Sequence, residues 1–264
     1  MTFIPKSLQT APDFVARLSD ISLVATDMDG TLTLDGRFTI ALLESWERLR
    51  QVGVEVLIVT GRSAGWVNGL SHYFPIVGAI AENGGLFYKT GHEHPDYLVD
   101  LEDISTHRQR LREMFDQLCQ DFPNLRESGD NAFRLTDWTF DVTGLSDAEL
   151  DQLGDRCRQQ GWSFTYSTVQ CHIKPATQDK ADGLLTVLDR HFPRLNPDQV
   201  ITVGDSPNDE SLFDARRFPL SVGVANLRHY GDRLTHHPTV ITTEAEVNGF
   251  CELVGAIVTA HTSG

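Results

Sequence analysis

The stretch ISLVATDMDGTLTL, residues 21–34, constrains the fold more than any other part of the chain. Its apolar, β-branched run stops abruptly at two carboxylates, Asp27 and Asp29, and at Gly30. A short apolar run bounded by a turn signal is typical of a buried strand, which would place Asp27 at the carboxyl end of that strand. In open parallel α/β sheets, this edge is where ligands bind.

Similar runs recur further along the chain. The segments 54–60 and 199–205 are nearly continuous apolar runs that end at polar residues, and a shorter run covers 78–83. Between them lie segments with helical spacing of apolar residues, such as 40–52 and 181–192. Because strands that alternate with helices imply a parallel sheet, we predict an α/β fold with a Rossmann-like core.

The pattern changes between residues 86 and 174. There we expect a hairpin at 86–94, a helix at 105–120, and strands at 131–144 and 162–175 in which polar and apolar residues alternate. Strands of this kind have one face turned to solvent. The sequence therefore predicts a discontinuous core, formed by residues 1–85 and 175–264, and an inserted α+β domain formed by residues 86–174.

The composition excludes several classes of function. The chain has 264 residues and a formal net charge of −15, and such an acidic field repels nucleic acids and anionic membranes, so we expect neither as a partner. Residues 1–14 lack the apolar core of a signal peptide, and no apolar run is long enough to cross a membrane. We therefore expect a cytoplasmic location. The four cysteines show no close-pair spacing and are expected to be free thiols.

Polar clusters follow the ends of the predicted core strands and would meet at one edge of a parallel sheet. The clusters contain Asp27 and Asp29, then Thr60, Gly61 and Arg62, then Asp205, Asn208 and Asp209, with Lys180 starting the helix before the last strand. Carboxylates crowded into one cleft repel each other. A hard divalent cation relieves that repulsion, and Mg²⁺ prefers carboxylates, waters and phosphate oxygens.

This chemistry predicts phosphoryl transfer. An ionised carboxylate needs no base to attack, so Asp27 is the expected nucleophile once Mg²⁺ and Lys180 neutralise the phosphoryl group. Asp29 would protonate the leaving oxygen and then activate water. Thr60 and the Gly61 amide would hydrogen-bond the non-bridging oxygens.

These motifs resemble those of a known family. DMDGT (27–31), VTGR (59–62), Lys180 and GDSPND (204–209) look like the four motifs of haloacid-dehalogenase superfamily phosphatases. The segment AENGG (81–85), followed by an insertion, is similar to the Cof-type subfamily, subclass IIB, which has a C2 cap and includes sugar-phosphate phosphatases and phosphomannomutases. The resemblance implies Asp27 as nucleophile and Asp29 as acid and base.

The resemblance also implies which residues bind the metal and the phosphate. Thr60 and Lys180 would bind the phosphoryl group. Mg²⁺ would be held by the side chains of Asp27 and Asp205 and the carbonyl of Asp29, with Asn208 and Asp209 in support. One departure is that the family often has Lys-Gly where this chain has Lys180-Ala181, so Lys174 competes for the same role.

The roles of three further side chains are less strongly indicated by the sequence. Arg134, in the inserted domain, is our candidate for binding the distal part of the substrate. Arg62 would either form a salt bridge within the fold or touch the substrate, and His172 is expected to be a surface or packed histidine. The predicted function is a Mg²⁺-dependent phosphatase for a small phosphorylated metabolite, with a sugar phosphate as the expected substrate. The alternatives are a phosphomutase of the phosphomannomutase type and a non-catalytic phosphate-binding module.

Overall fold

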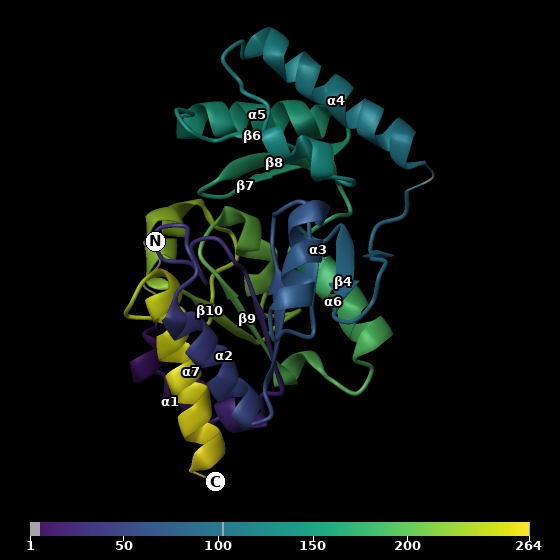
Figure 1. Cartoon of the computed structure of the whole chain (residues 1–264). Coiled ribbons are helices and arrows are strands. Elements are labelled where there is room, and N and C mark those ends of the chain that lie inside the picture. The colour runs from purple at the N-terminus through teal and green to yellow at the C-terminus, as the bar shows by residue number, and fades with distance from the viewer. Residues whose placement is uncertain (1–5, 102, 264) are drawn as a thin grey trace.

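The computed structural model describes residues 6–101 and 103–263. Within these residues the chain forms a large mixed sheet and a small antiparallel one (Figure 1). The strands of the large sheet lie in the order β11 (Val240–Ile241), β10 (Leu220–Gly223), β9 (Val200–Gly204), β1 (Leu23–Thr26), β2 (Glu55–Val59), β3 (Gly78–Ala81), β4 (Leu86–Lys89), β5 (Asp96–Tyr97). The small sheet has the order β6 (Trp138–Asp141), β8 (Gln170–Pro175), β7 (Trp162–Tyr166).

The centre of the large sheet is parallel and covered on both faces, which confirms the α/β prediction. β1 pairs in parallel with β2 and β9. Val24 and Ile58 pack in one apolar cluster with α2 (Ile40–Gln51), α3 (Ala64–Tyr73) and α7 (Glu246–Thr262), whereas Ala25 and Val59 pack on the other face with α6 (Lys180–His191). Burial of both faces explains why these strands read as continuous apolar runs. The helices are α1 (Pro12–Val15), α2 (Ile40–Gln51), α3 (Ala64–Tyr73), α4 (Ile104–Asp121), α5 (Asp147–Gln159), α6 (Lys180–His191) and α7 (Glu246–Thr262).

Short 3₁₀ helices connect several of these elements. They are η1 (Leu8–Thr10), η2 (Leu18–Asp20), η3 (Gly129–Phe133), η4 (Pro197–Gln199), η5 (Pro207–Phe213) and η6 (Ala225–Arg233).

The strands β4 and β5 continue the large sheet rather than leaving it. After the turn at Gly84 and Gly85, β4 runs back antiparallel beside β3, and β5 pairs with β4. The sequence-based boundary at residue 86 therefore falls inside the large sheet. The segment that forms the second layer is shorter than expected, and we call residues 104–175, from α4 to β8, the small unit.

In the small unit, α4 and α5 cover the side of the small sheet that faces away from the large sheet (Figure 1). The strand expected at 131–144 is reduced to β6, preceded by η3. The side chain of Asn131 explains the difference, because it accepts from the Thr139 amide at 2.9 Å and donates to the Thr139 carbonyl at 2.7 Å. A side chain that bonds the backbone in this way competes with a strand ladder.

Two further expectations concern the whole described chain. No helix in residues 6–101 or 103–263 is both long and apolar enough to cross a membrane. All four cysteines are free; Cys157 and Cys171 are buried in the small unit, whereas Cys119 and Cys251 are partly exposed.

Candidate active site

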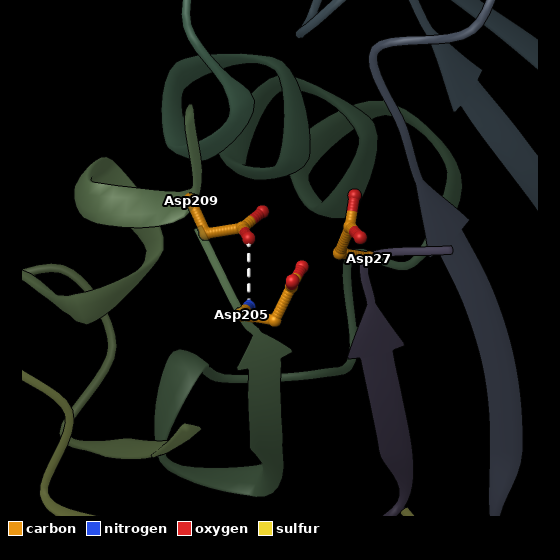
Figure 2. Close-up of side chains that lie close together, drawn as sticks. All are labelled: Asp27, Asp205 and Asp209. Atoms are coloured by element: carbon orange, nitrogen blue, oxygen red, sulfur yellow. Dashed lines mark hydrogen bonds between the residues drawn. The ribbon is translucent and has the colours of Figure 1, made fainter. Parts of the chain in front are cut away.

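The carboxyl ends of β1 and β9 lie next to each other at one edge of the large sheet. Thr26 is opposite Val203 in the parallel pairing, and each strand is followed by an aspartate, Asp27 or Asp205. Figure 2 shows these two side chains close together, with Asp209 beside Asp205. One oxygen of each of the three aspartates lies within 4.8 Å of the others. Carboxylates so close and so buried require positive charge nearby.

Lys180 supplies part of that charge. It is the first residue of α6 and is fully buried. Its Nζ donates to Asp27 Oδ1 at 2.5 Å and to Asp209 Oδ1 at 2.6 Å. Burial favours the neutral amine, but Asp209 and Asp27 outweigh it and raise the pKa of Lys180 above its usual value. Lys180 is therefore a cation that joins two of the three carboxylates.

The third carboxylate has no such partner. Asp205 accepts from the Thr31 hydroxyl at 3.4 Å and from Asn226 Nδ2 at 2.8 Å, but no lysine or arginine of the described residues forms an ion pair with it. Burial, followed by the charge of Asp27, raises the pKa of Asp205 well above its usual value. A divalent cation favours the ionised form of such a carboxylate, so the aspartate cluster fits a metal ion.

Burial and the charge of Lys180 shift the pKa of Asp27 in opposite directions. Burial raises the pKa of Asp27 to about 7, although Lys180 opposes the shift.

Gly30 allows the close approach that the cluster needs, because its φ is +81° and a Cβ there would lie 2.4 Å from Asp205 Oδ2. Glycine is thus favoured at position 30 both because a side chain would clash with Asp205 and because the backbone has a positive φ.

Arg62 binds Asp29 through both guanidinium branches. Arg62 Nε lies 2.8 Å from Asp29 Oδ2, and Nη2 lies 2.5 Å from Oδ1. The guanidinium also stacks over the ring of Trp66, 4.8 Å from its centroid, and the backbone amide of Arg62 donates to the Thr60 hydroxyl at 3.1 Å. The structure thus contains the salt bridge within the fold, and Arg62 also lines the cavity that contains Asp27 and Asp29.

Most of the predicted catalytic and phosphate-binding residues of the core line one narrow cavity; Lys180 does not. Its core-side wall contains Asp27, Asp29, Thr60, Gly61 and Asn208. The free volume is about 10 Å³, which is room for roughly one water molecule. The strand-end clusters that the sequence suggested are therefore brought together at this cavity.

The opposite wall comes from the small unit. It is formed by Ser167, Val169, Gln170 and His172. His172 is buried and faces the site, a position that sequence reasoning missed. Its alternating strand indicated that it lay on one face of β8, but no signal in the sequence told which face turns toward the core.

Asn83 is a second residue that sequence reasoning left without a role. It follows β3 in the AENGG segment and has φ +53°. Its Oδ1 accepts from Asn208 Nδ2 at 3.0 Å, while its buried Nδ2 has no hydrogen-bond partner among the described residues. The AENGG motif could have pointed to this residue, because asparagine is enriched at positions with a left-handed backbone conformation.

Arg134 lies inside the small unit with its donors occupied. Its Nη1 donates to Asp137 at 2.8 Å and to the Gly61 carbonyl at 2.9 Å. Its Nη2 donates to Asp130 and Gln170, and its Nε donates to Asp130. Every nitrogen of this fully buried guanidinium thus has a protein partner, which leaves it poorly suited to bind a substrate.

Glu82 connects the two sheets. It follows β3, and its carboxylate accepts from the Ala64 amide at 2.9 Å on the core side. On the side of the small unit it accepts from the amides of Leu135 at 3.0 Å and Thr136 at 2.6 Å, and from the Thr136 hydroxyl at 2.8 Å. This one side chain therefore holds the segment before β6 against the core.

Lys174 and Lys180 have different hydrogen-bond partners. Lys174, on β8, is buried, and its Nζ donates to the Gln178 carbonyl. Both lysines line a cavity of about 310 Å³ between β7 and η5, which is separate from the narrow cavity that Asp27 and Asp29 line. Of the two lysines, Lys180 is the one that contacts Asp27.

Comparison with known proteins identifies a family. The family model described as sucrose-6F-phosphate phosphohydrolase matches residues 21–252. Among curated relatives, the phosphoglycolate phosphatase of Metallosphaera sedula is 28% identical over 211 residues, which are 78% of this chain and 86% of that protein. The phosphoglycolate phosphatase of Staphylothermus marinus is 26% identical and covers 90% of this chain and 98% of its own.

Solved structures share the fold. The sucrose-phosphatase of Synechocystis, solved with sucrose and phosphate, superposes with a TM-score of 0.69 at 19% identity and covers 89% of this chain and 97% of its own. A Thermoplasma acidophilum protein gives a TM-score of 0.70 at 20% identity, with coverage of 90% and 98%.

Proposed function

The chain belongs to the sucrose-6F-phosphate phosphohydrolase family of haloacid-dehalogenase phosphatases, and from this membership we propose that it hydrolyses the phosphate ester of a small metabolite through an aspartyl-phosphate. The observation that carries the proposal is the contact between Lys180 and Asp27 at the end of β1. It pairs a buried nucleophile with a fixed cation at the sheet edge where ligands bind.

The reaction has two steps at Asp27. A carboxylate oxygen of Asp27 attacks phosphorus, the bond to the leaving oxygen breaks, and Asp29 gives that oxygen a proton. Water then attacks the phosphorus of the aspartyl-phosphate, Asp29 takes the proton of that water, and phosphate leaves. Thr60 and the Gly61 amide hold the non-bridging oxygens while Lys180 offsets their charge.

A divalent metal ion belongs to the same proposal. We assign it to the side chains of Asp27 and Asp205 and the carbonyl of Asp29, with Asp209 and Asn208 in support, and we propose Mg²⁺ because it suits carboxylates and phosphate oxygens. When bound, it would neutralise charge on the transferring phosphoryl group.

We propose that the small unit acts as a cap. It forms one wall of the narrow cavity, which holds about 10 Å³, so a substrate enters only when the small unit moves away from the core. We assign the cap to residues 104–175. The Cof-type assignment and the cytoplasmic location stay predictions.

A sugar phosphate is the first candidate substrate. The family's printed description and the sucrose-phosphatase likeness support it. Phosphoglycolate is a second candidate, because the relatives from Metallosphaera sedula and Staphylothermus marinus are named phosphoglycolate phosphatases and match most of the chain. Since the named relatives are phosphatases, the phosphomutase alternative is not favoured.

Phosphate release tests the function. Purified protein with Mg²⁺ should release phosphate from members of a panel of sugar phosphates, phosphoglycolate and para-nitrophenyl phosphate, and Asp27→Asn should abolish release while keeping a cooperative thermal melt. Isomerisation of a sugar phosphate without release would indicate a mutase. Release from none of the esters would favour the alternative of a non-catalytic phosphate-binding module. An active Asp27→Asn protein would exclude Asp27 as the nucleophile.

A further inference from the structure

Arg134 of the small unit forms a hydrogen bond to the core, at the loop that follows β2. We define this β2 loop as residues 60–62. The carbonyls of Thr60 and Arg62 each accept from a core amide at 3.0 Å. The carbonyl between them, that of Gly61, has no core partner in the described part of the chain and accepts from Arg134 Nη1 at 2.9 Å. The middle of the β2 loop is therefore held from the small unit.

Two carboxylates of the small unit fix the direction of this donor. Asp137 binds Arg134 Nη1 through both oxygens, at 2.8 and 3.0 Å, and Asp130 binds Nε and Nη2 at 3.3 and 2.9 Å. Although burial favours the neutral acids, Arg134 holds the pKa of both carboxyl groups below their usual range. A planar guanidinium bound by ionised partners on two sides is rigidly oriented, so the bond to Gly61 has a fixed direction.

The Gly61 carbonyl and the Arg62 amide belong to one peptide unit, which is planar. At its other end, the Arg62 amide donates to Thr60 Oγ1 at 3.1 Å. A contact that fixes the carbonyl therefore also fixes the amide that holds the Thr60 hydroxyl. Because this oxygen accepts from the amide, its own proton is left for another acceptor, and Thr60 lines the narrow cavity.

The β2 loop also packs directly against the small unit. A Cβ placed on Gly61 would lie 3.0 Å from His172 Cε1 on β8, which is closer than a side chain tolerates. The loop thus meets the small unit at the ring of His172 as well as at the guanidinium of Arg134. When the small unit moves away from the core, the β2 loop loses both contacts.

We propose that Arg134 is a positioning residue, which sets the 61–62 peptide, and through it the Thr60 hydroxyl, against the phosphoryl group when the small unit is closed. Arg134 does not touch the substrate. The inference rests on the proposed phosphatase function and adds a link between closure and chemistry, because the β2 loop reaches its working geometry only in the closed state.

A pair of arginine variants tests the inference. Arg134→Lys keeps the buried positive charge, but a single ammonium group cannot serve two carboxylates and the Gly61 carbonyl in one plane. Arg108→Lys is the matched control, because Arg108 donates to the carbonyls of Asn131 and Asp137 within the small unit. In Arg134→Lys, the inhibition constant of inorganic phosphate should rise about tenfold, the effect of one well-placed hydrogen bond. The kcat for para-nitrophenyl phosphate should fall at least as much. In Arg108→Lys, both should stay near the wild-type values.

The inhibition constant separates positioning from misfolding. An unfolded fraction lowers the measured kcat but leaves the inhibition constant of the folded enzyme unchanged. An unchanged inhibition constant in Arg134→Lys, or an equal rise in Arg108→Lys, would overturn the inference. Wild-type protein that hydrolyses not even para-nitrophenyl phosphate would instead contradict the proposed function.

Amide hydrogen exchange of the wild-type protein tests the same link without a variant. The amides of Leu135 and Thr136 donate to Glu82 across the boundary, so they exchange when the small unit separates from the core. The Arg62 amide should have a similar protection factor, and the amides of β1 a higher one. An Arg62 amide much more or much less protected than the Leu135 and Thr136 pair would show that the β2 loop moves independently of the small unit, against the inference.

Discussion

Arg62 and Asp29 form a two-pronged ion pair, with nitrogen–oxygen distances of 2.8 and 2.5 Å. Both oxygens of the proposed acid and base are thus held by one planar cation that itself rests on Trp66. The pair fixes the direction in which Asp29 can exchange a proton. A lysine would keep the charge but not the fork.

We therefore expect Arg62→Lys to lower kcat about tenfold or more, since a misplaced catalytic group loses much of its effect. Steady-state phosphate release measures this, with thermal melting to check the fold. Arg48→Lys, on the exposed face of α2, is the matched control. An unchanged kcat in Arg62→Lys would show that the pair does not orient Asp29.

Glu82→Gln should loosen the small unit. The Glu82 carboxyl group accepts from donors on both sides of the boundary, and an amide can replace only part of these contacts. We expect the free energy of unfolding to fall by about 1–3 kcal/mol. Amide hydrogen exchange of residues 135–137 should accelerate more than that of β1, and Glu44→Gln on α2 should change neither.

Lys180 and Lys174 should respond differently to the same substitution. Lys180→Met leaves Asp27 and Asp209 without their cation, so turnover should vanish and the free energy of unfolding should fall by about 3–5 kcal/mol. Lys174→Met should keep most of its turnover. Phosphate release and urea denaturation measure both effects, and loss of turnover in Lys174→Met alone would reverse the assignment.

Stability should depend on pH through Lys174. Burial lowers the pKa of Lys174 to about 8, below a value of about 10.4 in the unfolded chain. Between these values the unfolded state binds more protons, so the free energy of unfolding gained from this group rises with pH. From pH 7.5 to pH 10, wild-type protein should gain up to about 3 kcal/mol relative to Lys174→Met. Parallel urea denaturation of the two proteins checks this, and identical pH profiles would contradict it.

A divalent cation should stabilise the protein through Asp205. Protein stripped with a chelator should melt at a higher temperature when Mg²⁺ is added, with a gain of about 2.7 kcal/mol at a hundred times the dissociation constant. Asp205→Asn should remove most of this gain and the turnover. Sodium chloride at matched ionic strength is the control, and an equal gain in Asp205→Asn would place the ion elsewhere.

Much of the core could be read from the sequence because its signals are local. The apolar runs of β1, β2 and β9 are buried on both faces, and the residues at their ends must share one edge once the strands are parallel. Lys180 followed from the same reasoning, because it starts the helix next to β9 in the chain. The close approach of Asp205 to Gly30 and the salt bridge between Arg62 and Asp29 could be seen only in the structure.

The small unit could not be read in the same way. The alternation of polar and apolar residues along β8 predicted that its side chains point to two different faces. Which face meets the core depends on contacts with residues far away in sequence. Glu82 holds residues 135–137, and Arg134 reaches the Gly61 carbonyl. Such contacts leave no periodic trace in either segment, so the sequence predicts only a surface or packed histidine at 172 and a candidate substrate ligand at Arg134.

The central strand β1 has one neighbour close in the chain, β2, and one far away, β9. Every residue of the small unit lies inside the loop that the β1–β9 pairing closes. Since the entropy of closing a loop grows only with the logarithm of its length, even doubling the length of this whole loop would cost only about 0.6 kcal/mol. The lineage could thus exchange or enlarge this insertion while the aspartates at the ends of β1 and β9 stayed in register, so that new substrates become accessible without rebuilding the chemistry.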